Sequence, residues 1–148
     1  MARVSTYLNF TNQTEQAFNF YKTVFGTEFE GGGINRFGDM PPQEGHTVSE
    51  ADKNKVMHVS LPLSNGSMLM GSDTGGEWAK DSVVGNNISL SINVNSQDEA
   101  DRIFNALSAG GKVTMPMAKT FWGDYFGMCT DKFQINWMMS YNEQQQNK

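Results

Sequence analysis

The 148-residue sequence predicts an α+β fold in which one βαβββ module occurs twice. A short strand and an apolar helix recur 84 residues apart, with strands at 7–10 and 91–94 and helices at 13–25 and 97–109. Three strand-like segments follow each helix, and their apolar and polar residues alternate as in a half-buried sheet. Neither half could bury its sheet face alone, so we expect them to share one domain.

The helix boundaries carry the same signal in both copies. Asn12 and Ser96 each precede a glutamate by three residues, which is the capping-box pattern of a helix start. Gly26 and Gly110 follow the two helices, and glycine readily adopts the left-handed conformation that ends a helix. The two helices are therefore predicted with defined starts and ends.

The remaining segments complete each module. In the first half, a strand beginning at 28–30 is bent by Gly31-Gly32-Gly33, and strands 56–63 and 67–72 form a hairpin through Asn65-Gly66. The second half supplies strands 112–117, 125–130 and 135–141. These later strands match at an offset of about 68, so the first half holds roughly sixteen extra residues, which the polar loop 39–55 absorbs. The predicted domain spans 1–141, with modules at about 3–74 and 86–141, and 142–148 form a flexible tail.

Composition excludes several classes of protein. The net charge of -5 argues against a nucleic-acid partner, because phosphate binding relies on clustered lysine and arginine. No segment approaches about 18 consecutive apolar residues, so we expect no membrane span. Residues 1–5 lack the apolar run of a signal peptide, and the single cysteine, Cys129, cannot form an internal disulfide. We therefore expect a cytoplasmic protein.

Several segments together resemble a known family. They are Tyr7-Leu8-Asn9-Phe10, Ala17-Phe18-Asn19-Phe20-Tyr21, Val24-Phe25-Gly26, Arg36-Phe37-Gly38-Asp39-Met40-Pro41, His58-Val59-Ser60-Leu61, Leu69-Met70-Gly71-Ser72-Asp73, Gly127-Met128-Cys129-Thr130-Asp131-Lys132-Phe133 and Ile135-Asn136-Trp137-Met138. The chain is similar to the vicinal oxygen chelate superfamily, which includes glyoxalase I, extradiol dioxygenases and antibiotic-resistance proteins. Within it, the chain resembles the PhnB-like branch, also labelled demethylubiquinone methyltransferase-like.

The resemblance implies a glyoxalase/bleomycin-resistance/dioxygenase-like fold with curved mixed sheets. It also implies a homodimer with a ligand cavity inside each cup-shaped sheet. It implies no known reaction. Metal-using members place His, Glu or Gln on the first and last strand of each half. Those places fall near Thr6, Met70, Ser89 and Met138, and neither they nor their neighbours are His, Asp, Glu or Gln.

We accordingly predict a site without a metal ion and without a cofactor. The methyltransferase label has no support in the residues. A nucleotide-like cofactor needs a glycine-rich turn between a buried parallel strand and a helix, and neither Gly31-Gly32-Gly33 nor Gly75-Gly76 has that context.

Three groups of side chains are candidates for chemistry. His58, in the middle of a strand, is either bonded to a structural neighbour or a cavity residue able to act as ligand or general base. The family resemblance places Trp122, Asp124 and Tyr125 near the mouth of the cup, where an aromatic wall and a carboxylate would hold a small amine; alternatively, Trp122 packs the edge and Asp124 caps a turn. Cys129 is expected to be a buried, inert thiol. The predicted cavity lining is Tyr7, Asn9, His58, Trp122, Asp124, Tyr125 and Trp137.

The resulting hypothesis is a protein that binds a small organic molecule in a metal-free, glyoxalase-like cavity, with catalysis left open. One alternative is a metal-dependent lyase, isomerase or dioxygenase that uses His58 and a non-standard carboxylate; a two-histidine site would combine His46 and His58 with a carboxylate such as Asp73 or Glu44. The other histidine, His46, is expected to be solvated. A second alternative is a non-catalytic dimerisation scaffold.

Overall fold

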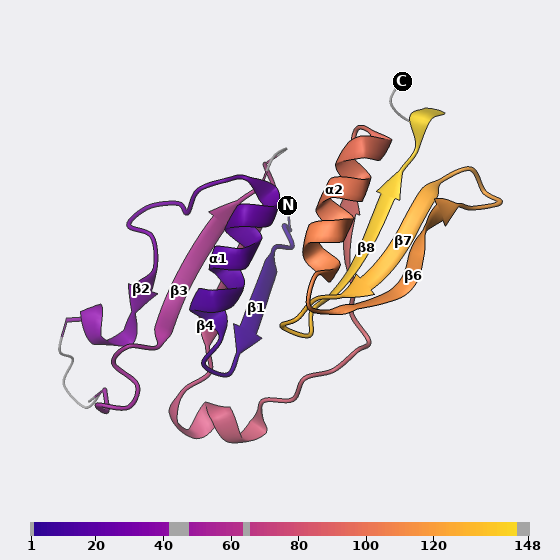
Figure 1. Cartoon of the computed structure of the whole chain (residues 1–148). Helices are drawn as coiled ribbons and strands as arrows, with labels where there is room; N and C mark the ends of the chain where they lie inside the picture. Colours follow the sequence, from indigo (N-terminus) through magenta and orange to yellow (C-terminus); the bar gives the residue numbers. More distant parts are fainter. Residues whose placement is uncertain (1, 42–47, 64–65, 145–148) are drawn as a thin grey trace. The chain divides into compact units, whose positions relative to one another are not determined.

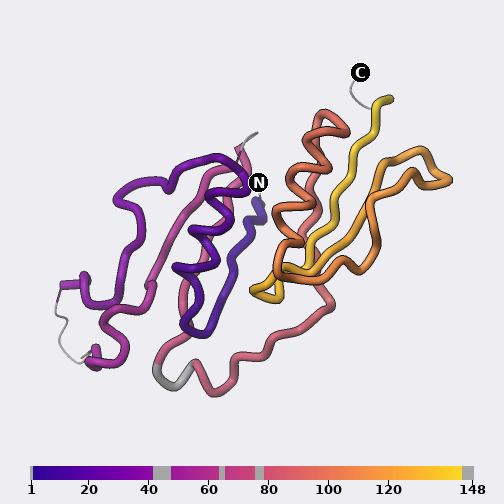
Figure 2. The backbone as a smooth tube through the Cα atoms, in the orientation of Figure 1, coloured from indigo at the N-terminus to yellow at the C-terminus, as the bar shows by residue number. Residues whose placement is uncertain are grey.

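A computed structural model describes residues 2–41, 48–63 and 66–144, without the side chains of 76–78. The chain divides into two compact units, Met1–Val83 and Val84–Lys148, each holding a four-stranded sheet and one α-helix (Figure 1). The backbone trace runs through the first unit before it enters the second (Figure 2). No helix in the described ranges is long and apolar enough to cross a membrane.

The first unit has the sheet order β1-β4-β3-β2. β1 is parallel to β4, whereas β3 runs antiparallel to both β4 and β2. Its elements are β1 (Thr6–Phe10), α1 (Thr14–Phe25), β2 (Asn35–Arg36), η1 (Phe37–Asp39), β3 (Val56–Pro62), β4 (Met68–Asp73) and η3 (Gly76–Asp81).

The second unit repeats this topology as β5-β8-β7-β6, with β5 parallel to β8 and the other pairs antiparallel. Its elements are β5 (Leu90–Asn93), α2 (Gln97–Ser108), β6 (Lys112–Lys119), β7 (Tyr125–Thr130) and β8 (Asn136–Tyr141). Because both sheets have the same order and directions, the predicted α+β fold with two βαβββ modules is confirmed. The offset of 68 also holds, since it maps β4 onto β8.

Each helix covers one face of its own sheet (Figure 1). In the first unit, α1 packs on β3 and β4, and a Cβ placed on Gly71 would lie 2.6 Å from the Phe18 ring. The apolar stripe of α1 therefore forms a core with that sheet face, as predicted. Its buried side chains are Ala17, Phe18, Tyr21, Val24, Val59, Leu61 and Leu69. In the second unit, α2 packs on β7 and β8 over Ile103, Phe104, Leu107, Cys129, Trp137 and Met139.

The predicted serine cap is confirmed at α2, and the predicted asparagine cap at α1 is wrong. The Ser96 hydroxyl accepts a hydrogen bond from the backbone N–H of Glu99 at 3.1 Å. Asn12 instead has a left-handed φ of 62°, and the residue before α1, Gln13, makes no side-chain cap. A carboxylate from β4, Asp73, accepts the N–H of Thr14 in its place. The helix start is thus satisfied from the sheet. Gly26 ends α1 with the expected left-handed conformation.

The segment after α1 departs most from the expected module. Residues 28–30 form no strand, and Glu30 makes one backbone bond, from its N–H to the Ser60 carbonyl, at 2.9 Å. Gly31 and Gly33 have positive φ, which confirms the bend predicted at the glycine triplet. The hairpin between β3 and β4 is confirmed by their antiparallel pairing, although Asn65 lies outside the described residues.

Candidate functional site

The sheet of the first unit has one face that α1 does not cover. Register places Tyr7 beside Met70 and Met70 beside Ser60 across three strands, while Asn9 lies beside Ser72. The intervening positions, such as Leu8, Val59 and Gly71, belong to the face beneath α1. Because side chains alternate along a strand, Tyr7, Asn9 and His58 share the uncovered face. Three of the predicted cavity residues are therefore neighbours.

A hydrogen-bonded chain links three side chains on this face. The Tyr7 hydroxyl lies 3.3 Å from Nδ1 of His58, and Nε2 of His58 lies 2.9 Å from the Ser60 hydroxyl. The Tyr7 and His58 rings are 5.8 Å apart between centroids, at an interplanar angle of 31°. Both imidazole nitrogens thus have a hydroxyl partner. Ser60 was missed in the sequence, although its spacing of two residues from His58 on one strand was the available signal.

A second polar contact lies on the same face. The Ser72 hydroxyl donates to the Asn9 side-chain oxygen at 3.3 Å, which leaves the amide nitrogen of Asn9 as a further donor. Together with the Tyr7–His58–Ser60 chain, it gives this face donors and acceptors beside the thioether of Met70.

The strand positions that hold metal in the wider superfamily do not fit an ion here. Tyr7 pairs with Met70 in the first unit. In the second, Met138 pairs with Ser91, which lies two residues beyond the predicted position Ser89. A phenol, a hydroxyl and two thioethers are a poor donor set for a divalent cation. Among the described residues, no group of three or more His, Cys, Asp or Glu side chains could hold a metal ion.

The metal-dependent alternative gains no ligand set from these positions. Both nitrogens of His58 face hydroxyls, and Asp73, one suggested carboxylate, belongs to the opposite face of the sheet. His46 and Glu44 lie outside the described residues. That alternative remains a prediction.

In the second unit, Trp122 and Asp124 form one cluster. The Trp122 indole N–H donates to Oδ2 of Asp124 at 3.0 Å, and the side chain of Asn142 donates to Oδ1. The backbone of Asp124 also closes the turn with Thr120 through three hydrogen bonds. The Trp122 ring lies 6.1 Å from Phe126 between centroids. Asp124 therefore caps a turn and also orients the exposed indole.

Tyr125 and Trp137 lie on the opposite face of this sheet, beneath α2. The Tyr125 hydroxyl donates to Oδ1 of Asp101 on α2 at 2.6 Å, and this bond raises the pKa of Tyr125. Trp137 is 3% exposed, and its indole N–H donates to the buried carboxylate of Asp131 at 2.8 Å. The two side chains do not share the face of Trp122 and Asp124.

Cys129 is also buried beneath α2, at 2% exposure. Burial and the nearby Asp131 raise the pKa of its thiol to about 11. A thiol that stays protonated is a poor nucleophile. The predicted burial of Cys129 is confirmed, and its lack of reactivity stays a prediction.

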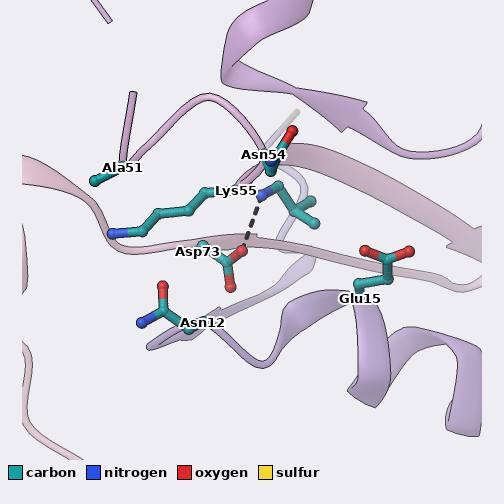
Figure 3. A pocket seen from close by; sticks show the side chains of 7 residues that line it. Asn12, Glu15, Ala51, Asn54, Lys55 and Asp73 are labelled. Carbon is teal, nitrogen blue, oxygen red and sulfur yellow. Dashed lines mark hydrogen bonds between the residues drawn. The ribbon is translucent and has the colours of Figure 1, made fainter. Parts of the chain in front are cut away.

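A separate polar pocket of about 430 Å³ lies in the first unit, around the start of α1 (Figure 3). It is lined by Asn12, Glu15, Ala51, Asn54, Lys55, Val56 and Asp73. Sequence reasoning did not assign it. Asp73 was recognisable as a polar residue in the buried stripe Leu69, Gly71, Asp73, where an apolar residue is the norm.

The charged groups of this pocket already have partners. Glu15 pairs with Arg36 at 2.9 Å and raises the pKa of that guanidinium through their hydrogen bond. Lys55 pairs with Asp52 at 2.7 Å and lowers the pKa of that carboxyl. Asp73 accepts backbone N–H bonds from Thr14 and Val56. These contacts hold α1, β3 and β4 together. The charged side chains of the pocket therefore have structural roles.

Comparison with known proteins places the chain in a family. The family model described as 3-demethylubiquinone-9 3-methyltransferase matches residues 2–140. The chain belongs to this family. Protein YjdN of Escherichia coli (strain K12) is 29% identical and matches 96% of this chain and 97% of its own length. Within the family, the chain is PhnB-like, as the resemblance in the sequence implied.

Solved structures agree with this placement. Protein PA1353 from Pseudomonas aeruginosa is 34% identical, with a TM-score of 0.77 over 96% of this chain and 98% of that one. A putative 3-demethylubiquinone-9 3-methyltransferase, PhnB protein, from Bacillus cereus is 24% identical, with a TM-score of 0.72 over 95% and 99%. The fold is also that of a glyoxalase/bleomycin resistance protein/dioxygenase family enzyme from Burkholderia phytofirmans PsJN (16% identity, TM-score 0.62, covering 92% and 96%).

These relatives establish the family and the fold, and no specific activity follows from them. The description of the family names a methyltransferase activity, but a shared fold does not establish a shared function. We therefore infer the function of this PhnB-like chain from its own residues.

Proposed function

We propose that this PhnB-like chain binds a small organic molecule on the uncovered face of its β1–β4 sheet, without a metal ion. The observation that carries the proposal is the Tyr7–His58–Ser60 hydrogen-bonded chain, which lies beside Asn9 and Met70 on one face. Small-molecule sites combine apolar surface with a few placed polar groups, and this face has that composition. Tyr7, Asn9 and His58 are the contact residues of the proposed site.

In the second unit, taken by itself, we propose Trp122 as a separate candidate contact residue. Its indole is half exposed, with a relative accessibility of 53%, while Asp124 holds the indole N–H. Asp124 accepts from Trp122 and from Asn142, so it positions the indole ring, and its carboxylate keeps further acceptor capacity for a ligand amine. Trp122 and Asp124 are the candidate contacts of this unit.

We further propose a homodimer in the cytoplasm. β6 is an edge strand of its sheet, and Val113 and Met115 on it are more than 40% exposed. Phe121, in the turn after β6, is 97% exposed. Apolar side chains gathered along an unpaired edge support a surface for a second copy. The location is supported by the single buried thiol, which suits a reducing compartment. Analytical ultracentrifugation tests the dimer, and a monomer at micromolar concentration would contradict it.

A thermal-shift screen of metabolites tests the binding function. A ligand that binds only the native state at about 100 times its Kd adds roughly 2.7 kcal/mol to stability, which shifts Tm by several degrees. Tyr7→Phe and His58→Gln should reduce that shift, measured against each variant's own melting temperature. Tyr125→Phe is the matched control, because this tyrosine lies beneath α2.

The thermal-shift screen and a metal analysis of the purified protein together separate the alternatives. If no compound raises Tm of the wild-type chain, the binding function fails and the scaffold hypothesis is favoured. If purified protein holds near-stoichiometric metal that His58→Gln removes, the metal-dependent enzyme is favoured instead.

A further inference from the structure

The number of hydroxyl protons that the Tyr7–His58–Ser60 chain can offer to a ligand depends on the protonation of the His58 ring. A neutral imidazole has one N–H donor and one nitrogen acceptor. One of its two hydroxyl partners therefore accepts from the ring, and the other donates its only proton to the ring. In either tautomer, a single hydroxyl proton remains free to point away from the chain.

Protonation of the His58 ring changes the number of hydroxyl protons that are not used within the chain. Both nitrogens of an imidazolium are donors, so both would donate to the hydroxyl oxygens of Tyr7 and Ser60. Neither hydroxyl proton is then used inside the chain. The face would present two O–H donors on either side of a positive charge, an arrangement suited to an anionic oxygen.

We propose that this site takes small organic carboxylates and that binding is coupled to proton uptake by His58. The inference rests on the proposed function and specifies its ligand class. A carboxylate accepts from both hydroxyls and stabilises the imidazolium, whereas a neutral amide of the same shape gains no charge interaction.

Several segments lie around His58 and bring different groups to it. β1 presents Tyr7 and Asn9, β4 presents Met70 and Ser72, and β2 places Asn35 in register with His58. Among these strand neighbours the phenol of Tyr7 is the titratable group, and Glu30, whose backbone N–H donates to the Ser60 carbonyl, brings a carboxylate to the segment beside β3. The nearest basic residue along β2, Arg36, is already paired with Glu15 of α1.

Matched pairs of acids and amides test the inference on the full-length protein. Acetate and acetamide, benzoate and benzamide, and phenylacetate and phenylacetamide are titrated by calorimetry at about pH 5.5 and pH 8. At an intermediate pH, two buffers of different ionisation enthalpy report the protons taken up. We expect the best carboxylate to bind roughly tenfold tighter at the lower pH, with up to about one proton taken up per site. The amide should bind more weakly, with no change between the two pH values.

Three variants assign the effect to the chain. His58→Gln keeps hydrogen-bonding groups but cannot take up a proton, so the pH dependence and the proton uptake should vanish together. Tyr7→Phe and Ser60→Ala each remove one hydroxyl and should weaken carboxylate binding several-fold at the lower pH. Ser91→Ala, which removes a serine hydroxyl from β5 in the second unit, is the matched control and should leave affinity unchanged. Circular dichroism checks that each variant is folded.

Equal affinity for acid and amide, affinity that rises with pH, or pH dependence that survives in His58→Gln would each overturn the inference. If no carboxylate binds, but another metabolite gives a thermal shift that is lost in Tyr7→Phe, the carboxylate inference is overturned and the binding function stands. Failure of the carboxylates and of the whole screen would overturn both.

Discussion

The indole N–H of Trp137 donates to the carboxylate of Asp131 at 2.8 Å, and both side chains are at most 3% exposed. The same carboxylate accepts the backbone N–H groups of Phe133 and Ile135 in the β7–β8 turn. One buried acid thus satisfies three donors, of which the Trp137 indole N–H is buried and the two backbone N–H groups are partly buried. The contact fixes the turn and places Trp137 in the core beneath α2.

Replacing Asp131 with alanine should destabilise the fold by about 3 kcal/mol, because an unsatisfied buried donor costs roughly 1–3 kcal/mol. Urea denaturation of wild type and variant measures the difference in the free energy of unfolding. Asp81→Ala, at an exposed position of η3, is the control and should change it by less than about 0.5 kcal/mol. If Asp131→Ala also changes the free energy of unfolding by less than about 0.5 kcal/mol, the Asp131 carboxylate is not needed for stability.

Asp73 should be similarly important for the start of α1. Its carboxylate joins Thr14 of α1 to Val56 of β3, at 3.1 and 2.8 Å. Asp73→Ala leaves two backbone N–H groups without this acceptor, and we expect a loss of about 2 kcal/mol. Amide hydrogen exchange should show the first turn of α1 losing protection before the rest of the helix. Unchanged protection at Thr14 would contradict the assigned role.

Gly71 should not tolerate a side chain. A Cβ there would lie 2.6 Å from the Phe18 ring and 2.9 Å from the backbone oxygen of Leu8, which cannot easily move. Gly71→Ala should therefore cost about 1–3 kcal/mol through overpacking. Gly32→Ala is the matched control, since nothing lies within 4 Å of a Cβ at that position. Equal melting temperatures for the two variants would refute this close packing.

The thiol of Cys129 should remain unreactive in the folded protein. Its pKa is raised from 9.0 to about 11, so almost no thiolate forms at pH 8. Alkylation by iodoacetamide at that pH should be at least about 100-fold slower than in urea. Rapid modification of native protein would contradict the burial.

The raised pKa of Cys129 also has a defined effect on stability. The unfolded thiol loses its proton first, so its stabilising contribution is complete below about pH 9 and declines as pH rises toward 11. The slope of unfolding free energy against pH in this range should be less negative in Cys129→Ala than in wild type. Other titrating groups affect both proteins, so the difference between the two slopes isolates the thiol.

Much of the fold could be predicted from the sequence because the signals are local. Apolar spacing and the serine cap give α2, while alternation gives β3, β7 and β8 to within about two residues. The recurrence of one module gives the shared topology. β2 could not be predicted at its real length of two residues, because the local pattern does not show how far a strand pairs with its neighbour.

The candidate site was predictable only in part. Tyr7, Asn9 and His58 alternate correctly and share one face. Asp124 and Tyr125 are adjacent in sequence but have different partners, because Asp124 holds Trp122 in the turn and Tyr125, at the start of β7, bonds to Asp101 of α2. A strand sends consecutive side chains apart, but only packing decides which face the helix covers. The sequence by itself determined two related modules with their helices and strands. The tertiary structure decided that Asp73, 59 residues away from Thr14, caps α1 and that hydroxyls enclose His58, because such contacts depend on strand register and helix packing across distant parts of the chain.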